Sequence, residues 1–164
     1  MNEVPEPEWR SLDPRVVAYW RLKACLGWAV LLAGVGIGGG FLWALTPAPR
    51  LLLLALVAVA TTWAGLEIFW LPRRRYRAFG YRLHEAFFEL RHGIFWRRSV
   101  MIPIRRIQHV DFLEGPWERR LRLARLQIYT AGTKSASHEL PGLERETALQ
   151  LRRELILAAG HEAT

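Results

Sequence analysis

The residues of this chain that could take part in chemistry are few and scattered. Its five histidines are His84, His92, His109, His138 and His161. They do not pair with a cysteine or with one another at the spacing of metal ligands. Ser99 has no nucleophile-elbow motif around it, and a single cysteine excludes an internal disulfide. The sequence therefore predicts no catalytic residue, no metal and no cofactor, and it argues against an enzyme.

One ionisable residue, Glu67, lies inside a long apolar segment. An acidic residue at membrane depth is by default a candidate for function, which would make the protein a small transporter or a subunit of a membrane complex. Glu67 also lies only one helical turn before the end of that segment. Its carboxylate could extend toward water there and meet Arg73 or Arg74. The residues alone leave both readings open.

Two apolar segments dominate the first half of the chain. Ala24–Leu45 has 22 residues and no charge, and Leu51–Leu71 has 21 residues and one charge. As helices, each would reach roughly 30 Å, the thickness of a bilayer's hydrocarbon core. Pro47 and Pro49 between them predict a turn. We therefore predict a transmembrane helical hairpin over residues 24–71, and we disfavour a buried helix pair in a soluble protein because such long uncharged runs are rare there.

The net charge of +8 lies entirely after the hairpin, because residues 1–71 carry five basic and five acidic residues. The basic residues that directly follow the second segment are Arg73, Arg74, Arg75 and Arg77. Basic residues flank the hairpin on its outer ends, so we expect a multi-pass protein of the bacterial inner membrane with both termini cytoplasmic. The four arginines are candidate contacts with anionic lipids, although a solvated basic surface would look the same. The other arginines of the domain are dispersed among the expected strands, and the rule for basic residues beside spans already explains this cluster, so we expect no nucleic acid as a partner.

Small residues in the first segment provide a candidate helix-packing face. Gly34 and Gly38 lie four residues apart, a spacing that lets helix backbones approach closely in lipid. Packing within the hairpin is the simpler interpretation, and a homo-oligomer is the alternative.

The hairpin divides the chain into four regions. Residues 1–23 are expected to form a loosely attached cytoplasmic arm and a lead-in helix, in which Asp13 caps the helix and Pro14 occupies its first position. Residues 24–71 are the hairpin, residues 72–160 a folded domain, and residues 161–164 a tail.

The folded domain alternates apolar and polar residues in short runs, which predicts strands. The expected strands lie around residues 79–83, 88–91, 98–102, 107–113, 126–129 and 137–140. Apolar residues then recur at helical spacing from Ala148 to Ala159, with Gly160 expected to end that helix. The fold class is therefore α+β: a two-helix hairpin followed by a small β-sandwich or barrel that the C-terminal helix covers.

Several motifs of the domain resemble a known family. The run Ile102-Pro103-Ile104-Arg105-Arg106-Ile107-Gln108-His109-Val110 is followed by Gly115-Pro116, by Tyr129-Thr130-Ala131-Gly132 and by Leu140-Pro141-Gly142-Leu143. This pattern is similar to the bacterial pleckstrin-homology domain family of YdbS-like membrane proteins. The resemblance implies a pleckstrin-homology-like barrel of two sheets with a C-terminal helix, and no established catalytic residues. This sequence departs from the family pattern at Arg122, because the family often has glycine there, directly before the pair Leu123-Ala124.

The sequence thus favours a membrane-anchored cytoplasmic binding or scaffold module that acts through protein–protein interaction. The candidate interaction residues are Arg105, Arg106, Gln108 and His109. The alternative for these residues is that they only support the fold through hydrogen bonds. Recognition of anionic lipid headgroups by the basic surface is the second functional hypothesis. Expected partners are membrane lipids and either a protein partner or a second copy of the chain.

Overall fold

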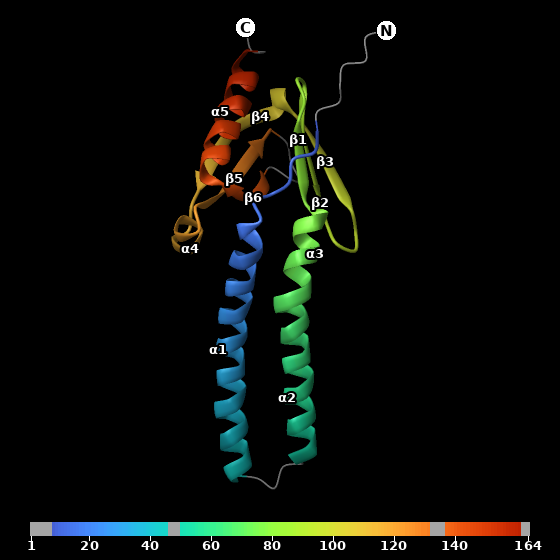
Figure 1. The fold of residues 1–164 in the computed structure, drawn as a ribbon, viewed down its shortest axis with the longest axis vertical. Helices are drawn as coiled ribbons and strands as arrows, with labels where there is room; N and C mark the ends of the chain where they lie inside the picture. The colour runs from blue at the N-terminus through green and yellow to red at the C-terminus, as the bar shows by residue number, and fades with distance from the viewer. Residues whose placement is uncertain (1–7, 46–49, 132–136, 162–164) are drawn as a thin grey trace. The chain divides into compact units, whose positions relative to one another are not determined.

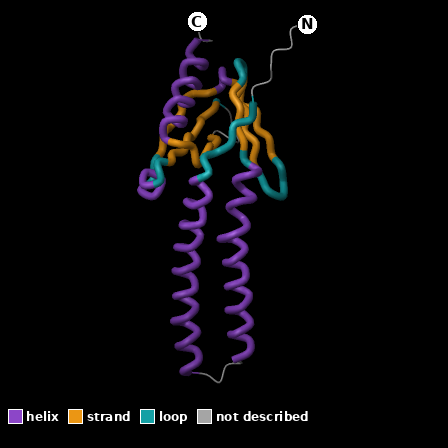
Figure 2. Tube along the Cα trace, viewed as in Figure 1, coloured by secondary structure: helices purple, strands orange, loops and turns teal. Residues whose placement is uncertain are grey.

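The computed structural model describes residues 8–45, 50–131 and 137–161. Residues 46–49 of the predicted turn and residues 162–164 of the predicted tail lie outside the described residues. The chain forms two compact units, one of residues Val17–Arg73 and one that combines the segment up to Val16 with the chain from Arg74 onward. Figures 1 and 2 show the long helices of the first and the strands of the second.

The first unit is helical, as the apolar segments predict. It contains most of α1 (Arg15–Leu45), then α2 (Arg50–Gly65) and the π-helix η1 (Leu66–Trp70). Two stretches, Arg15–Phe41 and Leu54–Ala78, are long and apolar enough to cross a membrane. Many of their apolar side chains are exposed, as in Val30 at 76% and Ile37 at 78%. A soluble helix pair would bury this surface, so a bilayer is the environment that fits it.

The second apolar helix does not stop at Pro72. It continues as α3 (Leu71–Ala78), so the basic cluster that follows the span is helical. Pro72 has no N–H to donate, and in a regular α-helix its ring would clash with the carbonyl of Ile68. The preceding turn widens to π geometry, with the Leu71 N–H donating to the Leu66 carbonyl. This widening accommodates the proline within a continuous helical stretch.

The second unit is an antiparallel sandwich of two three-stranded sheets. The first sheet has the order β1 (Gly80–Leu83), β2 (Phe87–His92), β3 (Arg98–Pro103). The second has the order β4 (Ile107–Leu113), β5 (Leu123–Thr130), β6 (Ser137–Glu144). The 3₁₀ turn η2 (Ile104–Arg106) joins the sheets, and α4 (Pro116–Arg120) connects β4 to β5. The α+β fold class is confirmed.

The C-terminal helix α5 (Arg145–His161) packs on the second sheet (Figure 1). It buries Ala148, Leu151 and Leu155, and the Arg152 Nε donates to the Val110 carbonyl at 3.0 Å. Two boundaries differ from the prediction. Strand β6 runs four residues beyond Leu140, and α5 continues through Gly160, which is not among the described glycines with positive φ.

The core of the sandwich is mainly aliphatic, and Phe88 of β2 and Tyr81 of β1 are aromatic members of it. Its fully buried members include Phe88, Ile102, Ile104, Leu123, Leu126, Ile128, Leu140 and Leu143. Strand β4 contributes both Ile107 and Val110, although strict alternation would place them on opposite faces. The register of β4 shifts between Ile107 and His109, and this bulge turns both apolar side chains inward.

A segment before the first span completes the sandwich, and we call residues 8–16 the strap. Arg10 exchanges two backbone hydrogen bonds with Tyr81 of β1, at 2.8 and 3.0 Å, and the Asp13 N–H donates to the Gly142 carbonyl of β6 at 2.9 Å. Leu12 and Val16 are buried. The strap therefore joins the two sheets. The expectation of a loosely attached arm is wrong for residues 8–14. Hydrogen bonds to distant strands order these residues, and such contacts leave no periodic pattern in the sequence.

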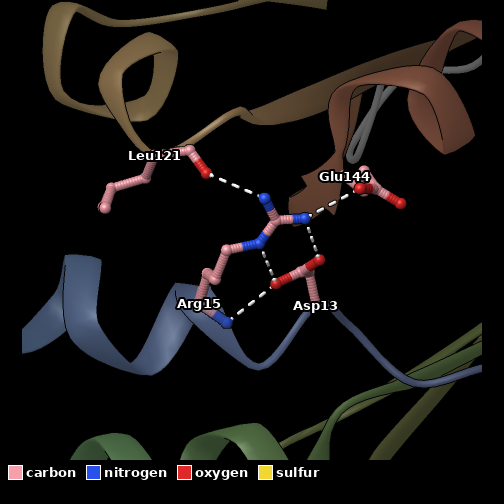
Figure 3. Close-up of polar contacts among 4 residues, drawn as sticks. All are labelled: Asp13, Arg15, Leu121 and Glu144. Atoms are coloured by element: carbon pink, nitrogen blue, oxygen red, sulfur yellow. Dashed lines mark hydrogen bonds and ion pairs between the residues drawn. The ribbon is translucent and has the colours of Figure 1, made fainter.

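Arg15 fastens the strap through charged hydrogen bonds (Figure 3). Its Nη2 donates to Asp13 Oδ2 and to Glu144 Oε1, each at 2.8 Å, and its Nη1 donates to the Leu121 carbonyl at 3.4 Å. The Arg15 backbone N–H donates to Asp13 Oδ1 at 2.8 Å, so the predicted helix cap at Asp13 is confirmed. The hydrogen bond from Arg15 holds the pKa of Asp13 below its usual value.

The departure from the family pattern at Arg122 has a structural cost. Arg122 has φ of 56°, the left-handed conformation that disfavours side chains with a Cβ by about 1–2 kcal/mol. Glycine would remove that strain but would also loosen the unfolded chain. We predict that Arg122→Gly raises the unfolding free energy by about 0.5–1 kcal/mol. Thermal unfolding of the full-length protein in detergent measures this.

Arg119→Gly is the matched control, because Arg119 lies in the right-handed helix α4. Glycine there should destabilise the protein by up to about 1 kcal/mol. A lower unfolding midpoint for Arg122→Gly would contradict the assignment of strain to that position.

Candidate functional site

A cavity of about 260 Å³ lies where α3 meets the loop between β2 and β3. Its described lining consists of Arg74, Arg77, Ala78, Arg91, Gly93, Ile94 and Arg97. Four of these seven residues are arginines and none is acidic. Guanidinium groups bind phosphates and carboxylates through paired hydrogen bonds, so the arrangement favours an anionic ligand. We call it the arginine cavity.

Helix α3 supplies two of the arginines through its regular geometry. Arg74, Arg77 and Ala78 stand at positions i, i+3 and i+4, which share one face of a helix. The same spacing is visible in the sequence. The spacing places these residues on one helix face only if the helix continues past Pro72. The sequence does not predict that continuation, so it does not predict a shared face for the basic cluster.

The loop Gly93–Arg97 supplies the opposite part of the lining. Strands β2 and β3 pair up to His92 and Arg98, so the loop is short and anchored at both ends. Gly93 has φ of 110°, and a Cβ there would lie 1.9 Å from the Trp96 carbonyl oxygen. Only glycine fits this position, and the close turn that it allows brings Arg97 beside the cavity.

Arg91 is positioned by the strap. The Trp9 ring lies 4.5 Å from the Arg91 guanidinium carbon and 4.6 Å from that of Arg82. Arg82 in turn donates from Nε to the Glu89 carboxylate at 2.6 Å, and the Ser99 hydroxyl donates to the other oxygen of Glu89 at 2.6 Å. Glu89 is buried. Ser99, Glu89 and Arg82 thus form a network of side chains that ends at Trp9. Arg82 makes one cation–π contact with the Trp9 ring, and the same ring holds Arg91 through a second.

The electrostatic environment beside the cavity is positive. His92, next to the cavity residue Arg91, is partly buried and stacks on Phe79 at 5.9 Å between ring centroids. Burial lowers the pKa of His92, and the charges of Arg98 and Arg75 and the nearby His138 lower it further. His92 therefore stays neutral near pH 7, and the arginines carry the charge.

The predicted lipid-contact residues separate into two groups. Arg74 and Arg77 line the cavity. Arg75 is exposed on α3 and acts on His92, while Arg73 is the exposed last residue of the helical unit. Arg91 and Arg97 were not predicted, because they lie more than a dozen residues further along the chain and only the β2–β3 hairpin brings them back.

The predicted interaction residues lie together on η2 and the start of β4. Arg105, Arg106, Gln108 and His109 are all exposed, and His109 stacks on Tyr129 with 4.2 Å between ring centroids. The backbone carbonyl of Arg106 accepts a hydrogen bond from the Ala131 N–H at 2.9 Å. The stretch is therefore accessible, but none of its residues is in the lining of the arginine cavity.

Within the helical unit, Glu67 lies in the π-helix and accepts a hydrogen bond from Trp28 Nε1 at 2.9 Å. This contact between the two apolar helices satisfies one carboxylate oxygen of Glu67. A Cβ placed at Gly34 or Gly38 would meet no heavy atom of the described residues within 4 Å. The glycines therefore remain a predicted packing face without a described contact. No group of three or more His, Cys, Asp or Glu residues that could hold a metal ion occurs in the described ranges.

Comparison with known proteins agrees with this architecture. The family described as bacterial PH domain matches residues 21–159. The chain belongs to the bacterial PH-domain family. This PH-domain protein is also 32% identical over 156 residues to the transmembrane protein YdbS of Bacillus subtilis (strain 168), an alignment that covers 93% of the chain and 91% of YdbS. No solved structure matches significantly. The resemblance inferred from the motifs is confirmed, and the protein is a membrane-associated member of the YdbS type.

The buried carboxylate of Glu89 gives a pH-dependent prediction. The Ser99 hydrogen bond and the pairing with Arg82 lower the pKa of Glu89 against its desolvation. Because the pKa of Glu89 is lower in the folded protein, its ionised carboxylate stabilises the fold at pH values above the pKa of the unfolded chain, near 4.5. This contribution is lost as the pH falls from there toward the pKa in the folded protein. Glu89→Gln should cost about 1–3 kcal/mol at pH 7 and progressively less below pH 4.5. Thermal unfolding across this pH range measures the difference.

Glu85→Gln serves as the control, because Glu85 is exposed in the connection between β1 and β2. It should shift the midpoint little at any pH. A Glu89→Gln penalty that stays constant down to pH 3 would show that the carboxylate charge is not what stabilises this network.

Proposed function

We propose that the PH domain binds the anionic headgroups of phospholipids in the membrane that anchors it. The arginine cavity is the observation that carries this proposal, because four arginines line one cavity with no acidic residue in its described lining. Like charges converge at a cost, and a bound phosphate offsets that cost. A protein partner at the exposed stretch Arg105–His109 stays a prediction, because none of these residues lines the arginine cavity.

The position of the cavity along the chain supports a lipid as the ligand. Arg74 comes three residues after Leu71, the last residue of the apolar segment. Three residues span at most about 11 Å even when fully extended. Arg74 is therefore within reach of the headgroup layer. Attraction to anionic lipids there contributes about 1 kcal/mol for each Lys or Arg.

This proposal requires the domain to lie on the cytoplasmic side. Arg15, Arg21 and Lys23 precede the first apolar segment and Arg73–Arg77 follow the second, which favours cytoplasmic termini. We predict that a reporter that works only in the cytoplasm is active when fused after Gly160. A reporter that works only outside the cytoplasm should be active when inserted at Pro47–Pro49. A periplasmic signal from the C-terminal fusion would place the cavity against the wrong leaflet and overturn the proposal.

Headgroup recognition is tested on the full-length protein in mild detergent by native mass spectrometry. We expect phosphatidylglycerol to bind more tightly than phosphatidylcholine. Arg77→Gln and Arg97→Gln should each weaken phosphatidylglycerol binding about five-fold, the equivalent of about 1 kcal/mol. Phosphatidylcholine binding should not change.

Arg153→Gln is the matched control, because it removes the same charge from an exposed position on α5 that is not part of the cavity lining. It should leave phosphatidylglycerol affinity unchanged. Equal affinity for the two lipids, or an equal loss in the Arg153→Gln variant, would show that net charge and not the cavity attracts the lipid.

A further inference from the structure

The tip of the β2–β3 loop exposes two large aromatic side chains side by side. Phe95 is 77% exposed and Trp96 is 90% exposed. Burying an aromatic side chain removes roughly 150–250 Å² of surface from water, so leaving two neighbours exposed forgoes substantial stabilisation. Adjacent exposed aromatics of this size indicate a surface that another phase or molecule covers.

The loop presents these side chains from a defined backbone. The hairpin is paired through His92 and Arg98, and Gly93 packs so closely that a Cβ would overlap the Trp96 carbonyl. The backbone of Trp96 is therefore held by the turn. A rigid aromatic tip loses little conformational freedom when it is buried in a new environment.

The surroundings of the tip indicate what covers it. Arg97 of the same loop lines the arginine cavity, and Ile94 adds an apolar contact to that lining. Tryptophan beside arginine is the composition of surfaces that sit at a membrane interface, where the indole lies among headgroups and the guanidinium binds phosphate. The cavity also includes Arg74, three residues after the apolar segment, which keeps it within chain reach of a bilayer.

We propose that Phe95 and Trp96 insert into the boundary between headgroups and acyl chains of the cytoplasmic leaflet, as a membrane contact in addition to the two apolar helices. The occupant of this surface is the anionic bilayer that the chain itself crosses. The inference rests on the proposed function in one respect: phosphates bound by the arginine cavity hold the loop at that depth. The two proposals still make separate predictions, because insertion needs a bilayer and headgroup binding does not.

The experiment places a spin label in the loop of the full-length protein. Cys25 is the single cysteine, so Cys25→Ser gives a background in which Phe95→Cys or Trp96→Cys takes one nitroxide. The labelled proteins are reconstituted into bilayer discs that contain phosphatidylglycerol. We expect the nitroxide at either position to collide more with oxygen, which concentrates in lipid, than with a water-soluble nickel chelate.

Trp117→Cys is the matched control, since Trp117 is an exposed tryptophan of the same domain on α4, at 47%. Its label should remain accessible to the nickel chelate. Labels at 95 and 96 that are as accessible to the chelate as the label at 117 would overturn the insertion. The substituted positions are exposed, so misfolding is not expected, and unfolding midpoints near that of the Cys25→Ser parent verify it.

A second measurement separates this inference from the proposed function. The double variant Phe95→Ser, Trp96→Ser should keep its preference for phosphatidylglycerol in detergent, because the cavity arginines are intact. Aqueous labels together with intact lipid selectivity would overturn the insertion alone. Inserted labels without lipid selectivity would overturn headgroup recognition, and the dependence of insertion on the arginines with it.

Discussion

The docking of the strap on both sheets is the interaction on which the rest of the domain depends. Two residues of the strap pair with different sheets, Arg10 with Tyr81 and Asp13 with Gly142. The Arg15 guanidinium then bridges Asp13 and Glu144 at 2.8 Å each. Without these contacts the buried surfaces of Leu12 and Val16 would be exposed, and the edge of β1 would present unpaired backbone groups. A segment that precedes the two apolar helices is therefore part of the domain that follows them.

The strap also connects stability to the candidate site. Trp9 touches Arg91 through its ring, and the same ring touches Arg82, which is paired with the buried Glu89. A cluster of arginines is unfavourable by itself, because each guanidinium repels its neighbours and must be held in place. The domain uses aromatic stacking and one buried carboxylate to orient the charges while the lining of the cavity remains free of acidic residues.

Much of this architecture could be predicted from the sequence, because it depends on patterns among residues that are close together in the chain. The apolar segments, the alternation of the strands, the stripe of α5 and the Asp13 cap all depend on residues within a few positions of one another. What could not be predicted depends on distant partners. The strap has no periodicity, the continuation past Pro72 requires a π-turn, and the cavity combines Arg74 and Arg77 with arginines that a hairpin returns to them. The motif around Arg105 and Arg106 identified the family correctly, yet its exposed side chains are not in the lining of the arginine cavity.

The close fit of Val16 against Gly142 has a consequence for how the protein is made. A Cβ at Gly142 would lie 2.2 Å from the Val16 side chain, and the positive φ of 64° also favours glycine there. The ribosome completes the partner of Val16 about 125 residues after Val16 itself, which at about 5–20 residues per second takes roughly 6–25 s. Both apolar helices are synthesised early in that interval, before the Gly142 surface on which Val16 packs. Closure of the domain is therefore a late event in biogenesis, and it follows the emergence of the membrane segments from the ribosome.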